Sequence, residues 1–209
     1  MRLAGGTLIW AALVAAIGVP IALAGTSDLL AYRSPIYILA GFAGIVALGL
    51  VLLQPLLIGG TLPGLAGFRG RSAHHWIGGA LFLAVVIHVG GLWITSPPDM
   101  IDALTFTSPT PFSPFGVIAM WAIFATALLA SLRRRMGMRP RTWRNTHMAF
   151  AVVIVVGSVV HGLLIEGTME TMSKAALCTL VVAAATKVIA DRLWRKRSTS
   201  RGEETANPL

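Results

Sequence analysis

The stretches HHWIGGALFLAVVIH, residues 74–88, and HMAFAVVIVVGSVVH, residues 147–161, decide the fold of this chain. Each begins and ends with a histidine, and neither contains an aspartate, glutamate, lysine or arginine. Each also lies inside a longer uncharged run of roughly the 20 residues that a helix needs to cross the hydrocarbon of a bilayer. The two stretches therefore predict two membrane-spanning helices of one design.

The composition extends this interpretation to the whole chain. Of its 209 residues, 56% are hydrophobic and only 12% are charged, whereas soluble domains carry about 25% charged residues. The sequence predicts an all-α, six-helix membrane bundle within residues 1–194 and a basic, disordered tail over residues 195–209. The six expected spans are approximately Leu8–Ala24, Ile36–Ile58, His75–Ile94, Phe115–Leu132, His147–Ile165 and Ala175–Leu193.

The charges alternate between the two sides of the expected bundle. Arginines and one lysine gather between spans two and three, between spans four and five, and after span six. The other connections hold Arg33 and Lys174 against five carboxylates. The positive-inside rule then places both termini in the cytoplasm of a bacterial-type inner (plasma) membrane. The net charge of +9 is thus explained by topology, and we expect no nucleic-acid partner.

Two features at the ends of the chain leave smaller questions open. Arg2, the apolar run after it and Ala22-Leu23-Ala24 resemble a secretory signal, although the run exceeds the usual 7–15 residues. Cleavage there would leave five spans in the same orientation. The single cysteine, Cys178, excludes a disulfide framework and fits a small buried apolar residue.

The histidine spacing predicts the site. Fourteen residues separate His74 from His88, and fourteen separate His147 from His161. This spacing puts both histidines of a helix within about 40° of one face and about 21 Å apart along the axis. Both helices run outward from a basic loop, so we expect His74 level with His147, and His88 level with His161.

Two histidine pairs at two depths favour two haems, each with two axial imidazoles. Such ligation suits electron transfer without oxygen binding. Zinc requires three or four ligands around one ion, and a proton relay would more naturally include carboxylates in the spans. His75 lies about 140° away from His88 around the helix, so we expect it at the headgroup boundary.

Neighbouring residues could support such haems. Gly78, Gly91 and Gly157 lie three or four residues from a histidine, where a missing side chain would admit a porphyrin or simply tighten helix packing. Gly41, Gly44 and Gly49 suggest packing alone. Haem propionates prefer cationic partners, and the candidates are Arg144, Arg69 and Arg71 on the cytoplasmic side and Arg33 and Lys174 outside.

Three short segments resemble the ferric-reductase-like transmembrane family. They are His74-His75-Trp76-Ile77-Gly78, Pro114-Phe115-Gly116-Val117-Ile118, and Arg135-Met136-Gly137 through Trp143-Arg144-Asn145-Thr146-His147. The resemblance covers roughly residues 36–192, and the histidine spacing is its most specific part. His75 replaces the usual arginine, and Thr146 replaces the usual leucine. The family includes ferric reductase and NADPH oxidase cores and the haem subunit of periplasmic methionine-sulfoxide reductase.

The resemblance implies two haems b, with His74, His88, His147 and His161 as ligands. Because the sequence holds no G-x-G-x-x-G for a dinucleotide, we expect a separate electron donor, either a flavoprotein reductase or a quinol, and an acceptor outside. A flavin at the cytoplasmic face is a further candidate cofactor. The chain would be an electron-transfer subunit of an oxidoreductase system in contact with lipid. The alternative is a haem-free permease or membrane assembly factor.

Overall fold

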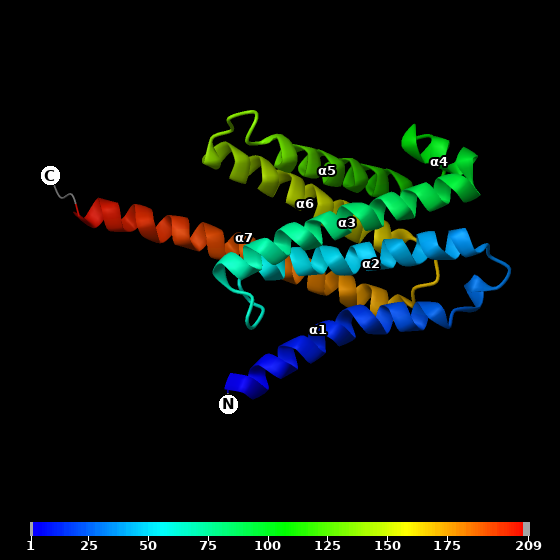
Figure 1. Ribbon diagram of the computed structural model, residues 1–209, viewed down its shortest axis with the longest axis horizontal. Coiled ribbons are helices and arrows are strands. Elements are labelled where there is room, and N and C mark those ends of the chain that lie inside the picture. The colour runs from blue at the N-terminus through cyan, green and yellow to red at the C-terminus, as the bar shows by residue number, and fades with distance from the viewer. Residues whose placement is uncertain (1, 207–209) are drawn as a thin grey trace.

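The structure confirms an all-helical membrane protein. The computed structural model describes residues 2–206, with side-chain packing described for residues 5–194. Six helices in this part of the chain are long and apolar enough to cross a membrane, and Figure 1 shows them as one elongated bundle. They are α1 (Arg2–Gly25), α2 (Pro35–Ile58), α3 (Gly67–Thr95), α5 (Ser113–Leu132), α6 (Pro140–Leu164) and α7 (Thr171–Ala206), joined by the 3₁₀ turn Asp28–Leu30 and the short helix α4 (Pro97–Leu104).

Local sequence explains where several helices begin. The hydroxyl of Ser34 accepts a hydrogen bond of 3.3 Å from the backbone N–H of Tyr37, and Pro35 occupies the first helical position of α2. Pro140 likewise occupies the first helical position of α6, where the N-cap residue Arg139 makes no side-chain cap hydrogen bond. The helix α3 begins at Gly67, well before the expected start at His75. Its first turns therefore carry the basic residues that the sequence had suggested for a loop.

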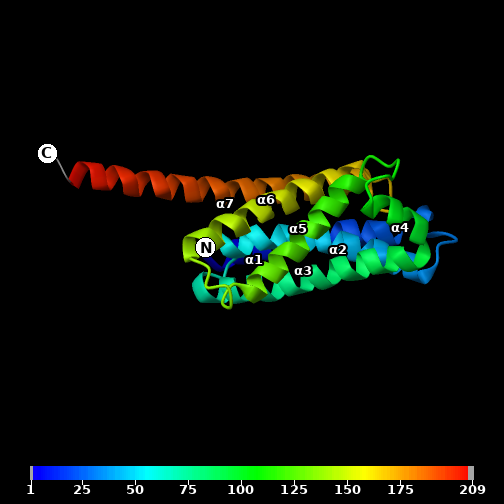
Figure 2. The same cartoon turned by 90° about the horizontal axis from the view of Figure 1, so that it is seen from above.

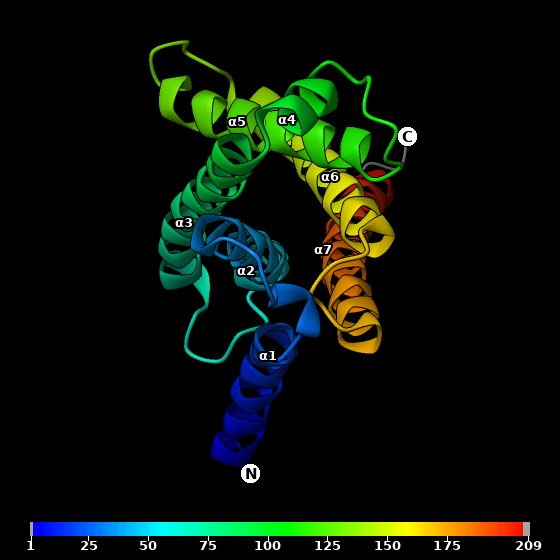
Figure 3. The same cartoon turned by 90° about the vertical axis from the view of Figure 1, so that its right-hand side faces the viewer.

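The bundle consists of two helical hairpins and two outer helices. The helix α2 packs along α3 and α5 packs along α6, while α7 contacts both α2 and α6, and α1 lies against α2 and α7. Figures 2 and 3 show the same arrangement from above and from one end. The buried core is centred on α2, whose side chains of Val51 and Leu52 are 3% and 2% exposed. Packing of α2 against its neighbours therefore fixes the height of the histidine-bearing helix α3.

The two ends of the bundle differ in charge. We call the end that holds both chain termini and the α2–α3 and α5–α6 connections the basic end (Figure 1). The opposite end, with α4 and the α1–α2 and α6–α7 connections, is the acidic end. Both α3 and α6 run from the basic end to the acidic end (Figure 1), as their charge pattern predicts.

Two connecting regions differ from simple loops. The Pro-rich connection after α3 forms α4, which begins one residue after Ser96, whose hydroxyl donates to a carboxylate oxygen of Asp99 at 2.5 Å. The backbone of α7 continues past residue 194, the expected end of the membrane unit, to Ala206. Residues 207–209 of the expected disordered tail lie outside the described residues. The arginine- and lysine-rich sequence after Trp194 favours helix until Gly202.

Glu170 caps the start of α7. Its carboxylate oxygens accept hydrogen bonds of 2.7 Å from the backbone N–H groups of Ser173 and Met172, which lower the pKa of the carboxyl below its ordinary value. The folded pKa is the lower one, so the cap stabilises α7 above the unfolded pKa. This stabilisation is lost as the pH falls through the folded value.

The Glu170→Ala variant should fray the first turn of α7. We expect faster amide hydrogen exchange at Met172 and Ser173 at neutral pH, measured by mass spectrometry of the protein in nanodiscs. The matched control is Glu166→Ala, which removes an exposed carboxylate from the same connection and should leave this exchange unchanged. Equal protection in the wild type and in Glu170→Ala would show that the carboxylate contributes no cap.

Candidate functional site

The four histidines expected to form pairs do meet in two pairs. The rings of His74 in α3 and His147 in α6 lie 5.9 Å apart between centroids, with an angle of 73° between their planes. The rings of His88 and His161 lie 6.5 Å apart at 77°. We call these the inner pair, near the basic end, and the outer pair, near the acidic end. The two helices therefore present imidazoles to each other at two depths.

The spacing within each pair suits one metal ion between two imidazoles. A bond from imidazole nitrogen to a metal ion is about 2 Å long, so two such nitrogens on opposite sides of an ion stand about 4 Å apart. The ring centroids then lie a further ring radius away on each side, or about 6 Å apart in total. The observed 5.9 Å and 6.5 Å match this arrangement, and they are too wide for a direct hydrogen bond between the rings.

Backbone carbonyls orient the outer pair. Nδ1 of His88 lies 2.7 Å from the carbonyl oxygen of Ala40, and Nδ1 of His161 lies 3.0 Å from that of Phe112. A carbonyl only accepts, so each Nδ1 carries the proton and donates it. The lone pair of a neutral imidazole is then at Nε2. Each outer histidine is thus held in the tautomer that a metal ligand requires.

Two glycines make these hydrogen bonds possible, and the sequence analysis did not identify either as part of the site. A Cβ added at Gly44 would lie 2.8 Å from Nδ1 of His88, and one added at Gly116 would lie 2.6 Å from Nδ1 of His161. Each glycine follows the accepting residue by four positions, in the next helical turn. The prediction that Gly44 serves helix packing alone was incomplete, because its missing side chain makes room for a histidine ring.

The inner pair is held less tightly. Nδ1 of His74 lies 3.3 Å from the carbonyl oxygen of Gln54, and Nδ1 of His147 is buried without a hydrogen-bond partner. The side-chain amide nitrogen of Gln54 is also buried without a partner. Such groups normally have partners inside a protein. The inner pair therefore offers donors to a group with acceptor atoms.

An aromatic and a cationic side chain flank His147. The Trp143 ring stacks on the His147 ring, with 5.1 Å between centroids and 28° between planes. The Arg133 guanidinium lies 5.2 Å above the Trp143 ring. Arg144, the expected cationic partner of this site, has an exposed side chain and makes no hydrogen bond or ion pair among the described residues. Contacts through Trp143 thus connect the positive charge of Arg133 to His147.

A cavity of about 600 Å³ adjoins both outer histidines. Its wall includes Arg33, whose guanidinium lies 4.8 Å above the ring of Tyr37. Three carboxylate residues also line it, namely Asp99, Asp102 and Glu166. Lys174, the other expected cation, is only 7% exposed, and its Nζ donates to the carbonyl oxygen of Ile165 at 2.8 Å. Arg33 is therefore the cation available to a ligand in this cavity.

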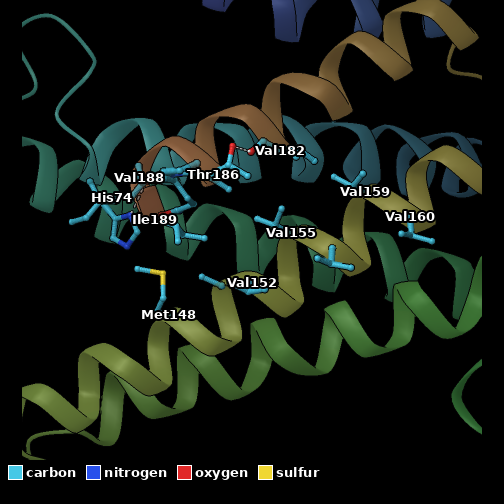
Figure 4. A pocket seen from close by; sticks show the side chains of 16 residues that line it. His74, Met148, Val152, Val155, Val159, Val160, Val182, Thr186, Val188 and Ile189 are labelled. Atoms are coloured by element: carbon cyan, nitrogen blue, oxygen red, sulfur yellow. Dashed lines mark hydrogen bonds between the residues drawn. The ribbon is translucent and has the colours of Figure 1, made fainter. Parts of the chain in front are cut away.

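A second, more apolar pocket adjoins His74 of the inner pair. It has a volume of about 390 Å³ and lies between α2, α6 and α7. Figure 4 shows His74 and Met148 toward one end and valines of α6 along its length. The partnerless amide of Gln54 belongs to this wall. An apolar wall with a few polar groups beside a histidine suits a flat, largely apolar cofactor.

The remaining expected site residues fall into two groups. His75 is exposed beside Trp76 and joins neither pair, as its helical angle predicts. Gly91 and Gly157 permit close helix packing, since an added Cβ would lie 2.7 Å from that of Ala40 and 2.9 Å from the Phe115 carbonyl oxygen. Gly78 faces the amide of Gln54, at 3.5 Å from an added Cβ. Of these glycines, Gly78 therefore stays a candidate for contact with a cofactor.

The ligand set fits a haem, the cofactor that the family resemblance implies. Among the described residues, no three His, Cys, Asp or Glu side chains gather in a group that could hold a metal ion. Each pair would offer two imidazole nitrogens, and pockets adjoin His74 of the inner pair and both histidines of the outer pair. A porphyrin provides four equatorial nitrogens and needs only two axial ligands from the protein. Two facing imidazoles beside apolar space meet that need.

Comparison with known proteins identifies the family. The protein-family model described as "ferric reductase like transmembrane component" matches residues 40–158, more than half of the chain. The chain belongs to the ferric-reductase-like transmembrane family. The matched segment holds His74, His88 and His147, and it ends three residues before His161. No curated protein and no solved structure gives a significant match. Membership in the ferric-reductase-like family supports a role in membrane electron transfer.

Helix packing near the outer pair of this ferric-reductase-like protein can be tested at Gly157. The Gly157→Ala variant places a Cβ against the backbone of α5, and overpacking of this kind costs about 1–3 kcal/mol. We expect a lower midpoint of thermal unfolding in detergent. The control is Gly90→Ala, where an added Cβ meets nothing within 4 Å. An unfolding midpoint of Gly157→Ala equal to that of Gly90→Ala would contradict close packing of α5 and α6.

Proposed function

We propose that the protein is a transmembrane b-type cytochrome that carries electrons through two haems, each held by two histidines. The observation that carries this proposal is the pairing of His74 with His147 and of His88 with His161 at two depths of one bundle. The family and the two adjoining pockets support it. The two imidazoles of each pair would hold a haem, which would supply one-electron transfer without binding oxygen.

The residues of the chain would provide position, polarity and exclusion of water. The Nδ1–H groups of His88 and His161 donate to backbone carbonyl oxygens, which leaves Nε2 as the ligand atom. Apolar side chains of α6 and α7 beside His74 would keep water away from a cofactor there. Gly78 gives room beside His74, and Arg144 and Arg133 supply positive charge at the basic end. Arg33 offers a charge-assisted hydrogen bond in the outer cavity.

The charge asymmetry supports a direction for the electrons. Under the positive-inside rule, the basic end faces the cytoplasm of a bacterial-type inner membrane, and both termini lie there. A cytoplasmic-side donor, a reduced flavoprotein or a quinol, would pass single electrons to the inner pair. They would then move to the outer pair and to an acceptor outside. A flavin bound at the basic end is a further candidate cofactor of this step.

Haem content tests the proposal directly. We expect the purified wild-type protein to bind two haems b per chain, measured by the pyridine haemochrome assay. Replacing one ligand of one pair, as in His88→Ala or His147→Ala, should reduce this to one haem per chain. The matched control is His75→Ala, which removes an exposed imidazole next to a proposed ligand and should retain both haems.

A colourless protein, produced with ample iron and porphyrin precursor, would contradict the proposal and favour a haem-free permease or assembly factor. One haem in the wild type would restrict the proposal to a single pair.

Transfer across the bilayer provides a second test. In proteoliposomes that contain an impermeable oxidant such as ferricyanide, a reductant added to the basic face should reduce the trapped oxidant. Electrons require both pairs to cross, so His74→Ala and His161→Ala should each lower the rate by at least about tenfold. His75→Ala should keep the wild-type rate. Equal rates in all variants would show that electrons do not pass through the pairs.

A further inference from the structure

The two histidine pairs differ in how their Nδ1–H groups are bound. In the outer pair both groups donate to carbonyls, at 2.7 Å and 3.0 Å. In the inner pair one distance is 3.3 Å, and His147 has no partner. Ala40, Phe112 and Gln54 are the residues whose carbonyls accept these hydrogen bonds.

The residue one helical turn after the accepting carbonyl explains this difference. In the outer pair that residue is Gly44 or Gly116, and each histidine ring occupies the space of the missing Cβ. For Gln54, which accepts from His74, the residue four positions later is Ile58. Gln54 follows Ala40 by 14 residues, and Thr126 in α5 follows Phe112 by the same number. The residue four positions after Thr126 is Ala130. The positions that correspond to Gly44 and Gly116 at the inner pair therefore carry side chains, those of Ile58 and Ala130.

A hydrogen bond from Nδ1–H makes the imidazole a more basic ligand. A more basic ligand donates more electron density to iron and favours the ferric state, which lowers the reduction potential. The outer pair has two such bonds of good length, whereas the inner pair has one long bond. The ligands alone therefore favour ferric iron more strongly at the outer pair.

The surrounding charges also favour a lower reduction potential at the outer pair than at the inner pair. Arg133 stacks on Trp143, which stacks on His147, and the α5–α6 connection carries further exposed arginines. Positive charge near a haem favours the reduced, less positive state. The outer cavity is lined by Asp99, Asp102 and Glu166 against Arg33, a net negative wall that favours the oxidised state.

We infer that the outer site, held by His88 and His161, has the lower reduction potential of the two. This inference rests on the proposed function. An electron arriving from the cytoplasm then stays on the inner site at rest, and its outward step is unfavourable without a driving force. A membrane potential that is negative inside supplies one, because it favours outward movement of negative charge. Reduction of the outer acceptor would thus depend on an energised membrane.

Redox potentiometry of the purified two-haem protein tests the inference. We expect two separate waves. The wave that remains in His147→Ala or His74→Ala, where only the outer site is filled, should be the lower one. The wave that remains in His88→Ala or His161→Ala should be the higher one. Either member of each pair serves if the other variant fails to fold.

Charge variants assign the waves without removing a haem. Arg133→Gln should lower only the higher potential, and Glu166→Gln should raise only the lower potential. The ligand contribution is tested with Gly44→Ala, which should raise the lower potential or weaken outer haem binding, against Gly90→Ala, which should do neither. Two haems with equal or reversed potentials would overturn the inference and leave the proposed function standing. Absence of haem would instead contradict the proposed function.

Discussion

The histidine site depends on the need of a buried imidazole nitrogen for a hydrogen-bond partner or a ligand. In a bilayer, an unpartnered polar group costs several kcal/mol because no water is available. His88 and His161 meet this need at Nδ1 by donating to the carbonyls of Ala40 in α2 and of Phe112, the N-cap residue of α5. The lone pair of each ring is then at Nε2, the atom that a metal ion would bind. Both hydrogen bonds require that α3 lies close to α2 and that α6 lies close to α5.

In both hairpins, glycines allow the two helices to pack closely. Gly91 allows α3 to approach Ala40, and Gly157 allows α6 to approach Phe115. Gly44 and Gly116 then admit the histidine rings themselves. In both hairpins the basic end differs from the acidic end, because Ile58 and Ala130 replace the glycines at the equivalent positions. The same fold thus gives the two pairs different hydrogen bonding, and with it a physical basis for different affinities for electrons.

Much of the fold was predictable because a membrane limits the backbone conformations that a chain can adopt. Backbone groups in hydrocarbon must be paired internally, so long uncharged runs become helices, and all six expected spans are present. The helical period also placed the paired histidines on shared faces and His75 away from them. Helix starts were less predictable, because α3 extends back to Gly67 through basic residues that carry no hydrophobic signal.

The sequence by itself determined the membrane location, the helical class and the spacing of histidines along two helices, since these follow from local composition and the geometry of one helix. Tertiary structure decided which atoms complete the site. The carbonyls of Ala40 and Phe112 are 48 and 49 residues from the histidines they bind, and all backbone carbonyls look alike in a sequence. The placement of Arg133, rather than Arg144, over Trp143 also arises only when the α5–α6 connection turns back on itself. Long-range contacts of this kind depend on how helices pack, and the periodicity of one helix does not contain that information.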